Sequence, residues 1–179
     1  MIPAQYAHVK AAFDIPLLFE AAKLVGIQEV VGKGSHPVIM SWAKRLGVAA
    51  IYTDDDTAWC GLAHANIVSL AGLPMPFKGY EVLRAKSWKD WGIGVRLRDA
   101  MLGDTLVFDR PGGFHVGLYV GEDDHHFYVL GGNQKNAYGF AKIEKNRCVA
   151  VRRPKYAEIP RSARKVIFQD NSAVSTNEA

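Results

Sequence analysis

The change of hydrophobic period near Gly103 constrains the fold of this chain more than any other sequence feature. Before it, apolar residues recur at helical spacing in segments 16–26 and 37–47, each of which opens with proline and closes with glycine. Proline is favoured at the first position of a helix, and glycine commonly ends one. After Gly103 come five short runs rich in β-branched and aromatic residues, separated by turn-forming residues: 103–110, 113–121, 125–132, 138–143 and 147–154. Helices followed by closely linked strands predict an α+β domain with a five- to six-stranded antiparallel sheet.

Two further helices are expected before the strands. One covers residues 58–70, with Thr57 or Asp56 as its N-cap, and a short one covers about 81–91. We therefore expect an N-terminal extension over 1–16, a functional domain over 17–154 and a C-terminal extension over 155–179. The polar last ten residues are expected to be disordered.

Composition limits the function classes only loosely. With 179 residues, 49% of them apolar, the chain can build one sizeable core. The net charge of +4 suits an anionic partner, such as a nucleic acid, an anionic cell-wall polymer or a membrane surface, without choosing among them. No aromatic and basic interleaving supports nucleic-acid binding. Because neither a membrane-spanning apolar run nor a secretory signal is present, we expect synthesis in the cytosol and no membrane insertion.

The two cysteines stand in different settings. Cys148, in NRCVAVRRP, is expected to be a small buried residue on a strand, and the chain has neither a disulfide framework nor a zinc spacing. Cys60 falls at the third position of the predicted helix 58–70, where free N–H groups and the helix dipole favour a thiolate. The acids at 54–56 oppose this unless they point away, cap the helix or bind a cation.

A thiol nucleophile needs a base, and the histidines differ in how well they could serve. His64 lies four residues after Cys60 on the same helix face, where it either reaches the thiol or is half-exposed. The pair at 125–126 follows a turn, where exposed histidines are ordinary. His115 begins a strand after two glycines and shares a sheet face with Gly117, an arrangement that predicts open space above the strand.

The strand that follows ends in two amides, Asn133 and Gln134. A neighbouring antiparallel strand can bring such an amide beside His115. The amide would then accept the ring N–H and fix the tautomer of the imidazole.

The segments WCGLAHAN, GDTLVF, HVGLYVG and VLGGNQ, in this order, resemble the NlpC/P60 and CHAP group of papain-like cysteine peptidases and amidases. The resemblance is closest to a phage-encoded branch with a PRILEWA-like helix, a D-D-x-T-x-W-C segment and GGNQ. It extends from about residue 17 to residue 154. It implies a papain-like fold, Cys60 as nucleophile, His115 as general base and Asn133 as the residue that orients the base, with Gln134 as the alternative. It implies no metal or cofactor.

Other positions follow from the same resemblance. Trp59 and Gly113 flank the pair and are the candidate substrate contacts, although packing beneath the sheet also explains the tryptophan. This chain departs from the group at the third member, which is often a histidine in NlpC/P60 enzymes and a Glu–Asn pair in CHAP enzymes. His64 also stands where an apolar residue is more usual.

The function that the resemblance implies is peptidoglycan hydrolysis, by an N-acetylmuramoyl-L-alanine amidase or a cell-wall endopeptidase. Such a monomeric phage endolysin would accumulate in the host cytoplasm and reach the wall after holin-type release. Three alternatives remain at this point: a secretion-system toxin with the same chemistry, a non-catalytic virion protein that binds the wall, and a metal hydrolase that uses Cys60, His64 and His115.

Overall fold

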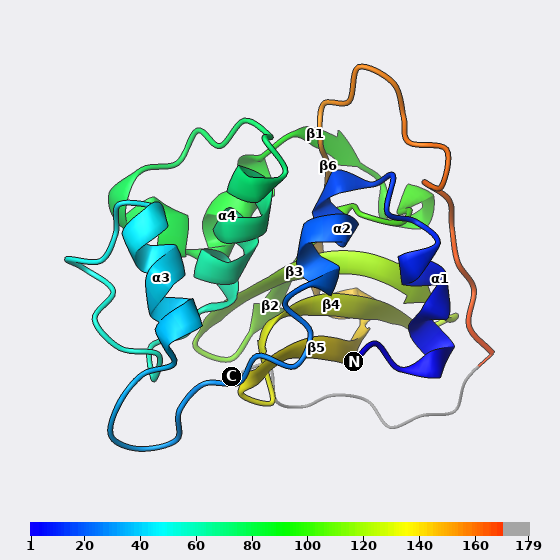
Figure 1. The fold of residues 1–179 in the computed structure, drawn as a ribbon. Helices are drawn as coiled ribbons and strands as arrows, with labels where there is room; N and C mark the ends of the chain where they lie inside the picture. The colour runs from blue at the N-terminus through cyan, green and yellow to red at the C-terminus, as the bar shows by residue number, and fades with distance from the viewer. Residues whose placement is uncertain (170–179) are drawn as a thin grey trace.

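A single six-stranded sheet with helices packed against it forms the computed structural model, which describes residues 1–169 (Figure 1). Every paired neighbour in the strand order β1-β6-β2-β3-β4-β5 is antiparallel. The strands are β1 (Ile93–Val95), β2 (Thr105–Arg110), β3 (Gly113–Glu122), β4 (His126–Gln134), β5 (Ala137–Glu144) and β6 (Cys148–Arg153). The predicted α+β class and the six-stranded antiparallel sheet are confirmed.

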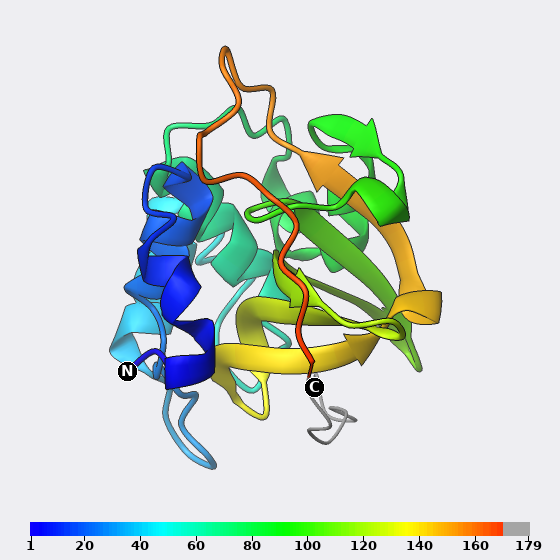
Figure 2. The same cartoon turned by 90° about the vertical axis from the view of Figure 1, so that its right-hand side faces the viewer.

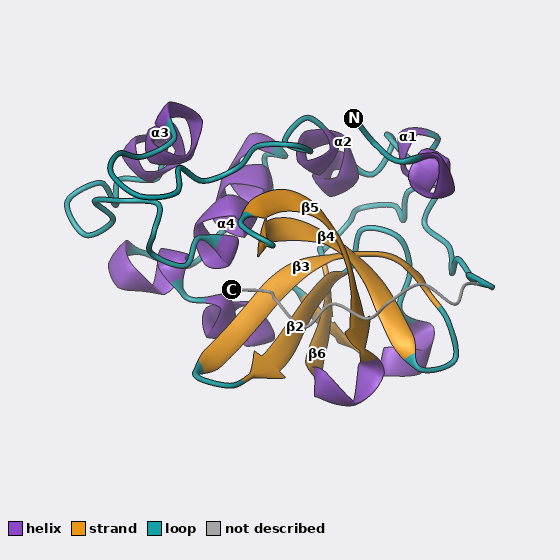
Figure 3. Cartoon of the chain, turned by 90° about the horizontal axis from the view of Figure 1, so that it is seen from below, coloured by secondary structure: helices purple, strands orange, loops and turns teal. Residues whose placement is uncertain are grey.

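Four α-helices and several 3₁₀ helices accompany the sheet. The α-helices are α1 (Ala7–Lys10), α2 (Pro16–Ala22), α3 (Pro37–Arg45) and α4 (Cys60–Leu70). The 3₁₀ helices are η1 (Ala4–Tyr6), η2 (Gly79–Leu83), η3 (Ala85–Asp90), η4 (Leu97–Asp99) and η5 (Lys145–Arg147). The short helix predicted near residues 81–91 is thus two 3₁₀ segments. In Figure 3 the labelled α-helices all lie on one side of the sheet.

The sheet is strongly curved. Strands β2 to β5 form the predicted meander, but β6 returns to the other side of β2. Only three residues separate β5 from β6, and four Cα steps span at most about 14 Å. In a flat sheet β5 and β6 would stand about 19 Å apart, four strand spacings. The short link therefore requires the sheet to curl, as Figure 3 shows.

Helix α4 is the central helix and is enclosed on all sides. Residues 60–68 are all buried, and the helix contacts α2, α3, η2, β3 and β4. A helix that packs on every side carries apolar residues all round, which explains why CGLAHANIV lacks a one-sided pattern.

The start of α4 differs from the prediction by two residues. Thr57 donates from both its backbone N–H and its hydroxyl to Asp54 Oδ1, at 3.1 and 3.0 Å. This cap closes a turn ahead of the helix, and the N-cap position belongs to Trp59, whose side chain makes no cap hydrogen bond. Cys60 is therefore the first helical residue and not the third.

The predicted N-terminal extension and the described part of the C-terminal extension, residues 155–169, pack against the domain. Near the N-terminus the residues Tyr6, Val9, Ala12 and Ile15 are buried in the core. After β6 the chain crosses the molecule, coloured orange to red in Figure 2, and forms a parallel bridge between Ile167 and Glu122. Phe168 then stacks on Tyr128 with ring centroids 4.3 Å apart. The residues predicted to be disordered, 170–179, lie outside the described part of the chain.

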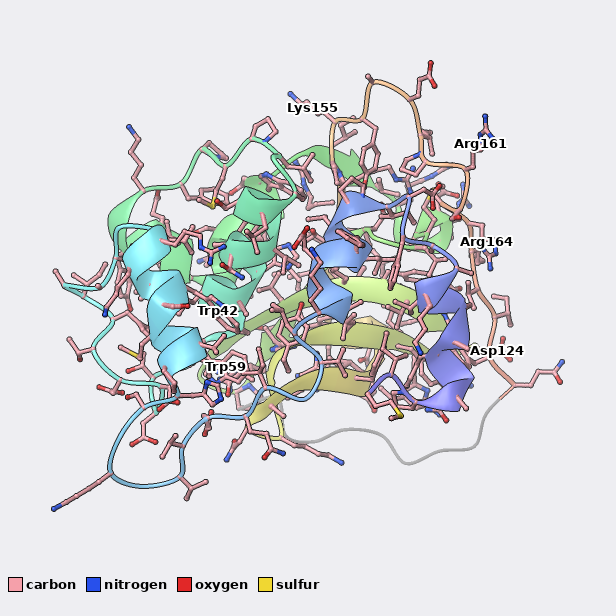
Figure 4. All side chains as sticks on the ribbon, in the orientation of Figure 1. Trp42, Trp59, Asp124, Lys155, Arg161 and Arg164 are labelled. Carbon is pink, nitrogen blue, oxygen red and sulfur yellow. The ribbon has the colours of Figure 1, made fainter. Side chains whose placement is uncertain are left out.

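The basic residues after β6 belong to the surface. Figure 4 shows Lys155, Arg161 and Arg164 extending outward from this segment. Among the helices of residues 1–169, none combines the length and the apolar character needed to cross a membrane.

Candidate active site

The sulfur of Cys60 lies at the first turn of α4, against strand β3. The side chain is 3% exposed, and a backbone hydrogen bond from Val116 reaches the sulfur. Burial raises the pKa of the Cys60 thiol; the hydrogen bonds from Val116 and from the helix start, together with the charge of Arg110, act in the opposite direction. The help that a helix N-terminus gives to a thiolate is present, but burial outweighs it and the thiol is protonated at neutral pH.

His115 is fully buried on β3, next to the residue that touches the sulfur. Burial, together with the charges of Arg110 and Arg147, lowers the pKa of its imidazole to about 3. The ring is therefore neutral at pH 7. Its Nε2 lies 3.3 Å from the side-chain amide of Gln134, and its Nδ1 has no hydrogen-bond partner. The amide nitrogen of Gln134 is the atom placed toward the ring, so Nε2 is the acceptor and the proton of the neutral ring lies on Nδ1. Nδ1 is free to take a proton only when the amide is turned by 180°.

Of the two amides predicted to orient His115, the alternative Gln134 makes the contact. Within residues 1–169 no hydrogen bond joins the Asn133 side chain to His115. The nitrogen and oxygen of a glutamine amide are interchangeable by rotation. In the turned orientation Oε1 of Gln134, otherwise buried without a partner, accepts the N–H of His115 Nε2.

A β-bulge in β4 explains why the amides exchange places. Gly131 pairs with Gly139, but Gln134 pairs with Ala137, so β4 carries one extra residue in this stretch. Asn133 absorbs it with a positive φ of 59°, a conformation that asparagine tolerates better than most residues. The extra residue shifts the side-chain alternation by one position. Gln134 consequently shares a face with Gly131, where a Cβ would lie 2.8 Å from its amide nitrogen.

The open space predicted above Gly117 does not exist. A Cβ at Gly117 would lie 2.5 Å from Cγ1 of Val129 and 3.1 Å from the carbonyl oxygen of Leu130. The glycine therefore allows β4 to pack tightly against β3. It supports the wall of the site and does not form a cavity.

His64 is a core residue. It is 3% exposed, not half-exposed as one reading of the sequence had it. Its Nε2 lies 2.9 Å from the hydroxyl of Thr105, and its ring packs edge-to-face on Trp88 at 4.5 Å. Burial lowers the pKa of His64 to about 3. The neutral ring thus links α4 to β2, and its hydrogen bond goes to Thr105 and not to Cys60.

Two of the three acids before Cys60 have structural roles. Oδ2 of the buried Asp55 accepts hydrogen bonds from the backbone N–H groups of Val30 and His36, at 3.1 and 2.7 Å. This carboxylate holds both ends of the glycine-rich loop between α2 and α3, while Asp54 closes the turn described above. In residues 1–169 no three His, Cys, Asp or Glu side chains are grouped so that they could hold a metal ion.

The two candidate substrate contacts, Trp59 and Gly113, lie in different environments. Trp59 is fully buried, donates from Nε1 to Glu29 at 2.8 Å and packs against Trp42 (Figure 4) with ring centroids 6.0 Å apart. The indole is committed to the core, which agrees with the packing beneath the sheet that the sequence also allowed. Gly113 is half-buried at the first position of β3, two residues before His115.

The histidines at the turn lie far from the pair. His126 opens the nine-residue strand β4, and Gln134 closes it, which places them about 26 Å apart at roughly 3.3 Å per residue. Nδ1 of His126 lies 2.9 Å from Asp123, and His125 is exposed. Neither can orient His115.

Sequence reasoning missed Arg110. Its positive charge lowers the pKa of both Cys60 and His115. Arg110 pairs across the β2–β3 hairpin with Gly113. Arg110 ends β2, and the next strand, β3, carries His115. This order along the chain could have pointed to Arg110 from sequence.

No protein-family model matches this chain, and no curated protein matches it.

Proposed function

We propose that the chain is a cysteine hydrolase that cleaves an amide bond of bacterial cell-wall peptide. One arrangement carries the proposal. The Cys60 sulfur lies at a helix start and accepts a hydrogen bond from the backbone N–H of Val116, the residue after the buried His115. Nε2 of His115 contacts the side-chain amide of Gln134, while Nδ1 has no hydrogen-bond partner. This arrangement agrees with the order of the motifs that resemble the NlpC/P60 and CHAP group. A papain-like identity of the fold is part of the same proposal.

The mechanism follows from the protonation states. Because thiol and imidazole are both neutral at pH 7, attack requires transfer of the Cys60 proton to Nδ1 of His115, in the tautomer that the turned Gln134 amide selects, as sulfur bonds to the amide carbonyl carbon. The backbone N–H of Cys60, which lies against the sulfur at the helix start, is the candidate donor to the oxyanion. The imidazolium then protonates the leaving amine, and the C–N bond breaks. Water, giving a proton to the same imidazole, releases the acid and restores the thiol.

Gln134 is a positioning residue in this scheme. It holds the ring through Nε2 and brings no charge, so the imidazolium is stabilised less than it would be beside a carboxylate.

The substrate class and the setting belong to the proposal as well. The positive net charge suits the carboxylates of cell-wall stem peptides. We propose that the protein is a phage endolysin, which acts on the cell wall after holin-type release from the host cytoplasm.

The nucleophile provides the direct test. Cys60→Ala should abolish release of muropeptides from purified peptidoglycan, followed by mass spectrometry of the products, which also identifies the bond. Cys148→Ser is the matched control and should retain nearly full activity, since Cys148 lies on β6 with its thiol bonded to the carbonyl of Ala150. If the Cys60 variant releases muropeptides at the wild-type rate, the thiol mechanism is excluded. If wild type binds the wall without cleaving it, the protein is a binding module.

A further inference from the structure

A groove with cationic and aliphatic walls lies at the edge of the sheet formed by β1. Strand β1 ends the sheet and pairs with β6 (Figure 1). Beside these two strands the surface is hollowed by about 430 Å³. We call this hollow the edge groove. Its walls include three cations and three aliphatic side chains, which are Lys89, Arg96, Arg152, Val95, Leu97 and Val149.

Arg152 is held across β1 by backbone carbonyl groups. Its Nε donates to the carbonyl oxygen of Trp91 and its Nη2 to that of Gly92, at 2.5 and 3.2 Å. The guanidinium passes over Gly94, where a Cβ would lie only 2.9 Å from Nη1. Within residues 1–169 Arg152 forms no ion pair. The backbone therefore fixes a positive charge at the groove without a carboxylate beside it.

The other charges of the edge groove have the same sign. In the part of the chain that the structure describes, no acidic side chain lines the groove, and Lys89 forms no ion pair. Arg96 pairs with Asp99 at 2.6 Å, but both side chains are exposed, and exposed pairs are weak. The groove therefore favours an anionic partner.

Exposed aliphatic side chains surround these cations. Ile93, Leu97 and Val149 are each between 40% and 50% exposed. Leu97 and Val149 line the groove, and Ile93 precedes Gly94 on β1. Apolar side chains gathered at one surface mark an interaction site, and a purely polar polyanion would leave them in water. A second copy of the chain fits poorly, because a two-fold contact sets each patch against itself and would oppose cation to cation.

We propose that the edge groove docks the protein on the surface of a bilayer that contains anionic phospholipid. Lipid phosphates would lie against Lys89, Arg96 and Arg152, and the aliphatic side chains would enter the boundary between headgroups and acyl chains. Such contact is peripheral and needs no helix that crosses the membrane. It uses no residue of the candidate catalytic pair, so docking and hydrolysis are separate properties of the chain.

Sedimentation of the full chain with lipid vesicles tests the charge of the groove. Wild type should bind vesicles made of equal parts phosphatidylglycerol and phosphatidylcholine about ten-fold more tightly than vesicles of phosphatidylcholine alone. The preference should fall as salt is added. Lys89→Gln/Arg96→Gln should weaken binding to the anionic vesicles about ten-fold. The control Lys44→Gln/Arg45→Gln removes two exposed charges from the end of α3 and should bind as wild type does.

The aliphatic side chains are tested separately. Leu97→Ser/Val149→Thr should also weaken binding to the anionic vesicles about ten-fold, and this loss should persist at high salt because it removes apolar contact. Urea unfolding of each variant checks that these exposed substitutions leave the fold intact.

Three outcomes would overturn the proposal. The first is equal binding of wild type to the two kinds of vesicle, and the second is a control variant that loses as much binding as the groove variants. The third is binding of wild type to soluble polyphosphate but not to anionic vesicles, which would make the groove a site for a soluble polyanion. Because the vesicle assay reports docking whether or not the protein cleaves peptidoglycan, its failure is distinguishable from failure of the proposed hydrolase.

Discussion

At the residue scale, one inserted position in β4 decides which amide serves the imidazole. Asn133 adopts the left-handed conformation of the bulge, and Gln134 reaches His115. We expect Gln134→Ala to lower kcat about 10²–10³-fold, because the ring loses the partner that fixes its tautomer and orientation. Asn133→Gly should stay within about three-fold of wild type, since glycine adopts a positive φ without strain. The two variants are compared on the same peptide substrate.

A purely structural role of Gln134 would give a different result. The rate of Cys60 alkylation by iodoacetamide, followed against pH, reports the ionisation of the pair. If Gln134 orients the base, Gln134→Ala should change this pH profile while Gln134→Asn partly restores it. An unchanged pH profile with a lowered kcat would mean that Gln134 acts through general packing. An Asn133→Gly variant as inactive as Gln134→Ala would mean that Asn133 has the orienting role.

At the element scale, the position of Cys60 depends on how closely α4 lies on β4. A Cβ at Gly132 would stand 2.7 Å from the Trp59 ring and 2.8 Å from Cβ of Ala63. Gly132→Ala should therefore destabilise the protein by about 1–3 kcal/mol and displace the first turn of α4. Gly139→Ala on the neighbouring strand is the matched control, because a Cβ there meets nothing within 4 Å. Urea unfolding of both variants measures the difference, and equal stabilities would show that α4 is not held by this contact.

The elements were more predictable from sequence than their junctions. Proline at 16 and 37 and the alternating runs after Gly103 are local signals, so α2, α3 and the strands lie close to where they were expected. The start of α4 was not, because Asp54 could cap either the turn or the helix, and tertiary contacts of Tyr52 with Thr57 select the turn. The bulge in β4 depends on pairing with β5 and leaves no local pattern. Cys60 and His115 were therefore nominated from sequence, while the choice of Gln134 over Asn133 required the strand register.

At the scale of the whole molecule, two neutral histidines are buried in the fold. His64 bridges α4 to β2, and His115 lies on β3. Their pKa values, each lowered to about 3 by burial, mean that the native state excludes protons that the unfolded chain accepts. The stability of the whole domain is therefore linked to pH through its core.

The sign of this linkage gives the last prediction. His64 has a pKa of about 3 in the folded state and near 6.5 in the unfolded state. Its contribution to the free energy of unfolding is therefore complete above pH 6.5 and falls as the pH drops from 6.5 towards 3. At pH 5 each such histidine costs about 2 kcal/mol relative to pH 7.5. His64→Gln cannot be protonated and can still bond Thr105, so its free energy of unfolding should fall by about 2 kcal/mol less than that of wild type between these pH values. Urea unfolding at pH 7.5 and 5.0 measures this, with the exposed His125→Gln as control. A loss in His64→Gln equal to that of wild type would mean that protonation of His64 does not limit stability, and that the acid response arises elsewhere in the fold.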